Sequence, residues 1–126
     1  MKSMPSRTPQ RAISIRQPYA EEIMRGLKVG EFRSVPTNIR ERVYVYASQK
    51  PGDPSDYDLG ASPEDLPRGV LVGTVEIVDC KWWAEEKCFA YCLANPKRLR
   101  RHLKPKQRPQ PIWFYPFGRP AKSGSK

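Results

Sequence analysis

Apolar and polar side chains alternate along short stretches of the chain, and each such stretch predicts a β-strand. Residues 12–16 and 43–48 show this alternation, which places every second side chain on the same face of a sheet. Residues 69–79 form the most apolar stretch, as expected for a strand that is buried on both faces. Residues 28–33 predict a further strand, and Gly30 inside it indicates a bulge or a close backbone approach.

Helical spacing occurs in two places. Pro18 suits the first turn of a helix, where its missing N–H costs nothing. Ala20 and Ile23 follow on one face, and Gly26 is suited to end this helix. Residues 88–95 carry apolar side chains at a similar spacing and predict a second short helix.

The predicted elements form one domain of the α+β class. Five to six short strands with two to three short helices fit a small mixed β-barrel with helices at its ends. The domain extends over residues 11–120, and the basic segment 1–10 and residues 121–126 predict disordered tails. Within the domain, residues 49–68 predict an acidic loop with one helical turn, and the aromatic-rich residues 111–117 predict a closing strand.

The charge of the chain narrows the classes of partner. Its 126 residues carry a net charge of +10 at pH 7, and the isoelectric point is near 9.8. Such an excess of lysine and arginine attracts polyanions, of which nucleic acid is the commonest. No apolar stretch is long enough to span a membrane, and the polar first residues do not resemble a secretory signal. We therefore expect a cytoplasmic protein that binds no membrane, with a monomer favoured.

The cysteines Cys80, Cys88 and Cys92 predict neither a disulfide framework nor a metal centre. Their odd, small number fits a reducing compartment. Together with His102 they have the residue types of a zinc site, but the spacing typical of such sites is absent. We expect small buried apolar residues at these positions, no metal and no cofactor.

Five segments, in the same order, resemble the ASCH domain family. Residues 26–33, Gly-Leu-Lys-Val-Gly-Glu-Phe-Arg, match the family signature G-x-K-x-x-E-x-R at every defined position. Residues 12–20 are similar to the opening strand and helix of the family, residues 43–48 and 69–80 to its later strands, and residues 91–113 to its C-terminal third. The resemblance covers nearly all of the predicted domain. It implies a PUA-like β-barrel with a cleft that holds the signature residues.

The resemblance also implies that the cleft binds RNA or a modified nucleoside. Some members of the family are amidohydrolases that act on N4-acetylcytidine, and others are associated with ribonuclease activity. In the amidohydrolase branch the signature lysine, here Lys28, and a glutamate of the central strand, here Glu76, are catalytic. The third residue there is a threonine, and this chain has Glu31 at that position. Lys28, Glu31 and Glu76 are therefore the candidate catalytic set, although Glu76 equally fits a strand position that faces solvent.

The signature residues carry a chemistry that follows from their types. Glu31 and Arg33 have the same parity on a strand. Either a bulge at Gly30 or a position of Lys28 in the turn before the strand would bring Lys28 to the same side. A guanidinium binds phosphate through two parallel hydrogen bonds, and a carboxylate accepts from the exocyclic amine of cytosine. The same three residue types also form structural ion pairs on strand edges, so their spacing alone leaves both interpretations open.

A basic segment, residues 97–108, contains seven lysines and arginines and no acidic residue. The aromatic residues 113–117 follow it closely. This combination suits single-stranded nucleic acid, because phosphates require charge and bases require flat apolar surfaces. Most of these aromatic side chains also fit a core position. The candidate RNA-binding residues are Lys28, Glu31, Arg33, Tyr44, Tyr46, Arg98, Arg100, Arg101, Lys104 and Lys106.

Three classes of function are compatible with these patterns. The first is an RNA-binding module that recognises single-stranded or modified RNA through the cleft and the basic segment, without turnover. The alternative is a hydrolase, either an N4-acetylcytidine amidohydrolase or a ribonuclease. The third is a protein-interaction domain of the coregulator type, which would need a large exposed apolar patch that the sequence does not reveal.

Overall fold

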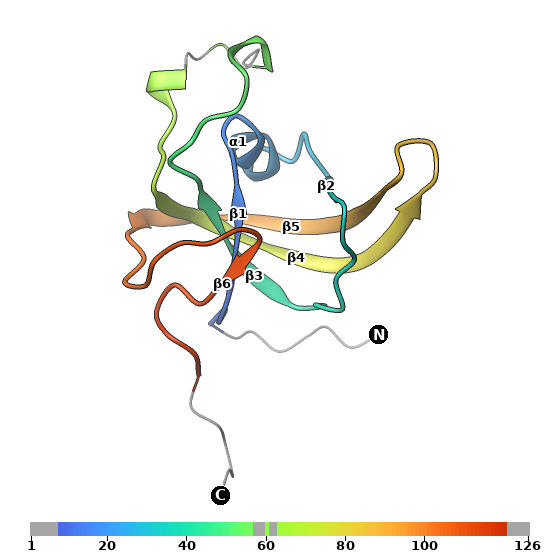
Figure 1. The fold of residues 1–126 in the computed structure, drawn as a ribbon. Helices are drawn as coiled ribbons and strands as arrows, with labels where there is room; N and C mark the ends of the chain where they lie inside the picture. Colours follow the sequence, from blue (N-terminus) through green and yellow to red (C-terminus); the bar gives the residue numbers. More distant parts are fainter. Residues whose placement is uncertain (1–7, 57–59, 61–62, 121–126) are drawn as a thin grey trace, which may run out of the picture.

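The computed structural model describes residues 8–56, 60 and 63–120. The expected tails fall outside this part of the chain, except for residues 8–10. One mixed sheet dominates the described residues, and Figure 1 shows the long β4–β5 hairpin crossing the molecule with α1 packed beside it.

The sheet contains six strands in the order β2-β5-β4-β3-β1-β6. They are β1 (Ala12–Ile15), β2 (Gly30–Arg33), β3 (Arg42–Ala47), β4 (Val70–Trp83), β5 (Cys88–Leu103) and β6 (Trp113–Phe114). The helical elements are α1 (Tyr19–Met24) and the single 3-10 turns η1 (Pro54–Asp56) and η2 (Pro63–Asp65). β1 and β3 pair in parallel and the other neighbours are antiparallel, so the sheet is mixed as expected.

The expected β-rich architecture is confirmed, whereas the expected barrel is not. β2 and β6 stay at opposite edges of the strand order, and no pairing between them closes the sheet in the described residues. The helices are also fewer than expected, since α1 is the single α-helix in this part of the chain. No helix among the described residues is long and apolar enough to cross a membrane.

The second predicted helix, residues 88–95, is wrong. These residues begin β5, where Cys88 pairs with Trp83 and Leu93 pairs with Ile77 of β4. The spacing of apolar residues suited a helix, but pairing with the apolar strand β4 decides the conformation. β4 and β5 have 14 and 16 residues, which makes them long rather than short, and the first half of the basic segment is strand as well.

Apolar side chains pack on both faces of the sheet. The main core lies under α1 and contains Ile13, Ile15, Ile23, Val43, Val45, Val75, Ile77 and Tyr91. The opposite face holds a smaller cluster with Tyr44, Tyr46, Leu71 and Phe114. Tyr44 and Tyr46, both expected among the RNA-binding residues, are therefore buried, so their rings offer little open surface to a base. Burial raises the pKa of both hydroxyls.

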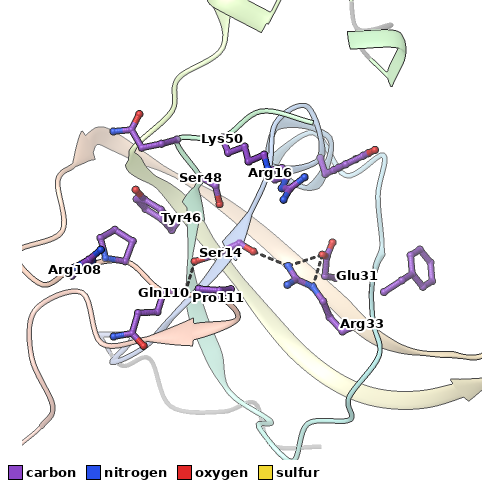
Figure 2. Close-up of a pocket in the computed structure, with 14 residues that line it drawn as sticks. Ser14, Arg16, Glu31, Arg33, Tyr46, Ser48, Lys50, Arg108, Gln110 and Pro111 are labelled. Carbon is purple, nitrogen blue, oxygen red and sulfur yellow. Dashed lines mark hydrogen bonds and ion pairs between the residues drawn. The ribbon is translucent and has the colours of Figure 1, made fainter. Parts of the chain in front are cut away.

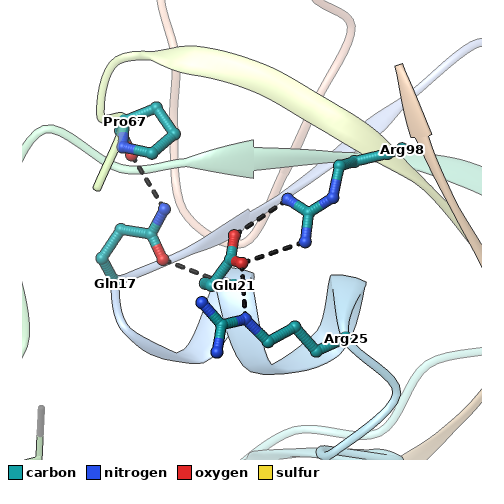
Figure 3. A network of polar contacts seen from close by, with 5 residues as sticks. All are labelled: Gln17, Glu21, Arg25, Pro67 and Arg98. Atoms are coloured by element: carbon teal, nitrogen blue, oxygen red, sulfur yellow. Dashed lines mark hydrogen bonds and ion pairs between the residues drawn. The ribbon is translucent and has the colours of Figure 1, made fainter. Parts of the chain in front are cut away.

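A polar network around the buried Glu21 fixes α1 to the sheet (Figure 3). Both Nη atoms of Arg98 on β5 donate to the Glu21 carboxylate at 2.9 Å, and Arg25 Nε donates to it at 2.8 Å. Gln17 donates to the Pro67 carbonyl at 2.8 Å and accepts from the Glu21 N–H at 3.0 Å. The network holds the corner between β1 and α1, which borders the cleft described next.

Candidate nucleic-acid interface

A cleft of about 730 Å³ opens beside β1, between β2 and the segment that precedes β6. Figure 2 shows side chains from these elements and from the end of β3 around it. The residues that line the cleft are Ser14, Arg16, Tyr19, Glu31, Phe32, Arg33, Tyr46, Ser48, Gln49, Lys50, Arg108, Pro109, Gln110 and Pro111. They come from four separate segments of the chain, so the cleft exists only in the folded chain.

Arg33 connects the two sides of the cleft (Figure 2). Its Nε donates to Glu31 Oε2 at 2.9 Å, and its Nη2 donates to the carbonyl of Ser14 at 2.7 Å. Ser14 also donates from Oγ to the Gln110 carbonyl at 2.8 Å and from its N–H to the Ile112 carbonyl at 2.9 Å. Although no backbone pairing joins β2 to β1, these bonds connect β2 with β1 and the segment before β6.

Glu31 presents one oxygen of its carboxylate to the cleft. Its side chain is 11% exposed, and Oε2 accepts from Arg33. The other oxygen, Oε1, has Lys28 Nζ 3.7 Å away, which is too long for a hydrogen bond. No buried side-chain oxygen of the described residues lacks a hydrogen-bond partner. Glu31 Oε1 is therefore accessible and can accept a hydrogen bond from a ligand.

Lys28 lies between Glu31 and two aromatic rings. Its Nζ is 5.3 Å from the centroid of the Tyr19 ring and 4.8 Å from that of Phe32, within the range of cation–π attraction. The structure thus brings Lys28, Glu31 and Arg33 into one group of contacts. Lys28 reaches this group from the segment between α1 and β2. The bulge or close backbone approach expected at Gly30 does not occur, because β2 pairs with β5 in unbroken register and the nearest backbone atom to a Cβ at Gly30 would be 4.0 Å away.

Three further cations face the cleft. Arg16 follows β1, Lys50 follows β3, and Arg108 lies in the segment before β6. No ion pair within the described part of the chain engages any of them. The hydroxyls of Tyr46 and Ser48 line the same space. The cleft therefore combines unneutralised positive charge with hydroxyl groups and one carboxylate oxygen.

The family model of the ASCH domain matches residues 13–114. The chain belongs to the ASCH domain family. It is also similar to Activating signal cointegrator 1 of Homo sapiens and of Mus musculus, with 34% identity over 80 residues in each case. The alignment covers 54% of this chain and 14% of each relative, so the ASCH domain spans a small part of the length of these proteins.

Glu76 is not brought to the cleft of this ASCH domain. It accepts from Arg42 at 3.2 Å and from Asn95 at 3.0 Å. Its neighbours Val75 and Ile77 point into the main core. Tyr91 points into the same core and pairs with Glu31, so Glu31 lies on that face of the sheet. Alternation along β4 therefore turns Glu76 to the opposite face of the sheet. The candidate catalytic set of Lys28, Glu31 and Glu76 is consequently split between the two faces.

The basic segment of the ASCH domain has two parts. Arg98 is bound to Glu21 and belongs to the network that holds α1. Arg100, Arg101, Lys104 and Lys106 are exposed and have no ion pair within the described residues. β5 ends near the cleft, because its residue Leu103 pairs with Leu71 of β4, and Leu71 pairs with Tyr46, which lines the cleft. The four exposed cations therefore lie on the part of the chain that continues to Arg108 in the cleft.

Sequence reasoning missed Arg16, Lys50 and Ser48 as residues of the interface. Arg16 and Ser48 each follow a strand of the parallel pair β1 and β3, and parallel strands bring their carboxyl ends to the same edge of a sheet. A prediction that β1 and β3 pair in parallel would therefore have placed Arg16 and Ser48 at the same edge of the sheet. Cys80, Cys88 and Cys92 are all free and are half-buried, not buried as expected. The described residues contain no group of three side chains suited to a metal ion.

Proposed function

We propose that this ASCH domain binds single-stranded RNA, with the phosphates at Arg16, Lys50 and Arg108 and a base beside Glu31. The observation that carries the proposal is the convergence of these three cations on one cleft, where none of them forms an ion pair with a carboxylate of the described residues. An unneutralised cation can release the counterions of a nucleic acid, which an arginine that is already paired does much less well.

The polar groups of the cleft support a contact with the base edge. Glu31 Oε1 is an open acceptor, and such an oxygen suits the exocyclic amine of cytosine or adenine. The pKa of the Tyr46 hydroxyl is raised by burial, so this group stays protonated and can donate. A single-stranded ligand fits this arrangement, because an unpaired base presents its whole edge to the protein.

The exposed cations of the basic segment would extend the contact along the backbone. Arg100, Arg101, Lys104 and Lys106 precede Arg108 in the chain and carry no ion pair in the described residues. A strand of several nucleotides would therefore bind more tightly than one nucleotide, and its affinity would fall steeply with salt.

The test measures the affinity for a fluorescein-labelled 12-nucleotide RNA by fluorescence anisotropy over a series of KCl concentrations. Lys50→Gln and Arg108→Gln should each weaken binding several-fold and reduce the slope of log K against log salt by about 0.7, the value for one lost contact with a single strand. Lys87→Gln removes the same charge at the tip of the β4–β5 hairpin and should leave the slope unchanged.

Equal slopes for the wild type and the two cleft variants would contradict the proposal, as would an affinity that does not depend on salt. A decrease in affinity with Lys87→Gln as large as with Lys50→Gln would indicate attraction by the net charge alone. In that case the cleft would not be the binding site.

A further inference from the structure

Two exposed aromatic rings contact each other on the outer side of the β2 edge. Phe32 is 44% exposed and Trp83 is 39% exposed, and their ring centroids are 5.1 Å apart with the planes tilted by 47°. Phe32 belongs to the edge strand β2, and Trp83 ends β4 at the base of the hairpin turn. Side chains of this size usually find a partner when a protein functions.

The pair of rings formed by Phe32 and Trp83 lies next to the cleft. Phe32 is itself one of the residues that line the cleft, although alternation along β2 turns its side chain to the other face from Glu31 and Arg33. Lys28 bridges the two places, since its Nζ is 3.7 Å from Glu31 and 4.8 Å from the Phe32 ring. A chain that leaves the cleft past Lys28 therefore meets Phe32 and Trp83 next.

Gly30 contributes to the position of the Phe32 ring. A Cβ on Gly30 would lie 3.4 Å from the tip of this ring, so the ring occupies the space over the glycine and is directed back toward Lys28. The ring is thus held beside a cation instead of extending freely into solvent. Adjacent aromatic rings and cations are the combination with which proteins hold single-stranded nucleic acid.

The charge of the surroundings decides which partner fits this surface. The chain carries +10, and Lys28 lies over the Phe32 ring. The neighbouring cleft holds three cations that form no ion pair with the described residues. A polyanion with flat apolar bases complements such a surface, whereas an apolar protein surface would complement the rings alone.

We propose that Phe32 and Trp83 form a stacking site for a second base, the neighbour of the base that binds beside Glu31. The inference rests on the proposed binding of RNA in the cleft and extends it: the ligand is a strand of at least two nucleotides that passes over β2. Lys28 then lies beside the phosphate that joins the two bases.

The hairpin offers a matched control on its other face. Trp82 is 55% exposed, more than Trp83, and contacts Phe89 at 5.0 Å between centroids. Phe89 pairs in register with Arg33, so this second aromatic pair lies on the opposite face of the hairpin from Phe32. Neither Trp82 nor Phe89 lines the cleft.

The experiment compares Phe32→Leu, Trp83→Leu and Trp82→Leu in their binding of an eight-nucleotide oligocytidine and of cytidine monophosphate. Loss of one stacked base should weaken the binding of the octamer about tenfold in Phe32→Leu and Trp83→Leu. Because Trp83 does not line the cleft, the affinity of Trp83→Leu for the mononucleotide should stay that of the wild type. Trp82→Leu should bind both ligands like the wild type. Circular dichroism checks that each variant is folded.

Tryptophan fluorescence gives a second measurement that does not depend on affinity. A base stacked on Trp83 quenches its indole emission, so saturation with the octamer should quench the fluorescence of Trp82→Phe and not that of Trp83→Phe. Quenching that persists in Trp83→Phe and disappears in Trp82→Phe would overturn the stacking site.

The two proposals fail in different ways. If Lys50→Gln and Arg108→Gln weaken the octamer while Phe32→Leu and Trp83→Leu do not, the cleft binds RNA and the stacking site is wrong. The aromatic pair would then be available to a protein partner instead. If the cleft variants bind the octamer like the wild type, the proposed function itself fails, and the stacking site fails with it.

Discussion

Two glutamates of this domain, Glu21 and Glu31, are equally buried but differ in the hydrogen bonds that their carboxylate oxygens accept. Each is 8% exposed and contacts two cationic side chains. Around Glu21, both carboxylate oxygens accept hydrogen bonds of 2.8–2.9 Å from Arg98 and Arg25. Around Glu31, Arg33 takes one oxygen at 2.9 Å, and the nearest cation to the other is 3.7 Å away.

This difference separates an ion pair that supports the fold from one that can support recognition. The Glu21 carboxylate has a donor on each oxygen, and it joins α1 to β5 behind the cleft. The Glu31 carboxylate keeps one oxygen open toward the cleft, and a buried charged acceptor that is only partly satisfied is a strong site for a ligand donor. Burial and charge alone do not distinguish the two, whereas the hydrogen bonds of each oxygen do.

Replacement of Glu21 by glutamine should have the largest effect, on stability. Arg98 and Arg25 would lose their anionic partner, and removal of one member of a buried pair costs several kcal/mol. Because Arg98 is 47% exposed in its side chain, water offsets part of the loss. We expect a decrease of about 2 kcal/mol in the free energy of unfolding, measured with urea.

Glu64→Gln is the control for this measurement, because Glu64 is exposed on η2. It should change the free energy of unfolding by less than about 0.5 kcal/mol. RNA affinity of the folded Glu21→Gln protein should stay near that of the wild type. A stable variant that has lost RNA binding would reverse the roles assigned to the two glutamates.

Replacement of Glu31 by glutamine should change the preference between bases. Arg33 requires an acceptor at the Oε2 position, so the amide nitrogen takes the open position and turns an acceptor into a donor. The preference for oligocytidine over oligouridine should fall by about tenfold, since one such contact contributes about 1–2 kcal/mol. Competition anisotropy with unlabelled octamers measures this ratio.

The exposed Glu86 on the hairpin provides the matched variant, Glu86→Gln, which should keep the wild-type ratio. An unchanged ratio in Glu31→Gln would show that the open oxygen takes no part in base recognition. The cleft would then bind phosphates only.

The smallest effect concerns the dependence of stability on pH. Hydrogen bonds from Arg98 hold the pKa of Glu21 below its ordinary value of 4.5. A carboxyl whose pKa is lower in the folded state stabilises the fold above about pH 4.5, and this contribution is lost as the pH falls through the folded pKa. Protonated Glu21 still accepts hydrogen bonds, so the loss is smaller than that caused by substitution.

Urea unfolding of the wild type should therefore show a free energy that decreases more steeply from about pH 5 to about pH 3 than that of Glu21→Gln. Glu64→Gln should follow the wild type. Parallel curves for all three proteins would contradict the lowered pKa of Glu21.

The sequence predicted the contacts that are local in the chain. The signature places Lys28, Glu31 and Arg33 within six residues. Strand parity for Glu31 and Arg33, and a place for Lys28 just before the strand, were therefore enough to expect them together. Strands β1, β3 and β4 were predicted because each contains either alternating apolar and polar residues or a continuous run of apolar residues. α1 was predicted from its spacing and the proline before it.

The sequence failed where partners distant in the chain decide the structure. Residues 88–95 have helical spacing, yet pairing with β4 makes them a strand. Arg16 and Lys50 meet only because β1 pairs in parallel with β3, which no local pattern reveals. Glu76 was an ambiguous candidate, and its partners Arg42 and Asn95 come from neighbouring strands.

Ser14 ties the cleft together mostly through its main chain. Its N–H bonds the Ile112 carbonyl and its own carbonyl accepts from Arg33, whereas its hydroxyl supplies one further bond, to Gln110. The two main-chain bonds exist for any residue at this position except proline, which lacks the N–H. The side chain at this position of the cleft can therefore be replaced while both main-chain bonds remain.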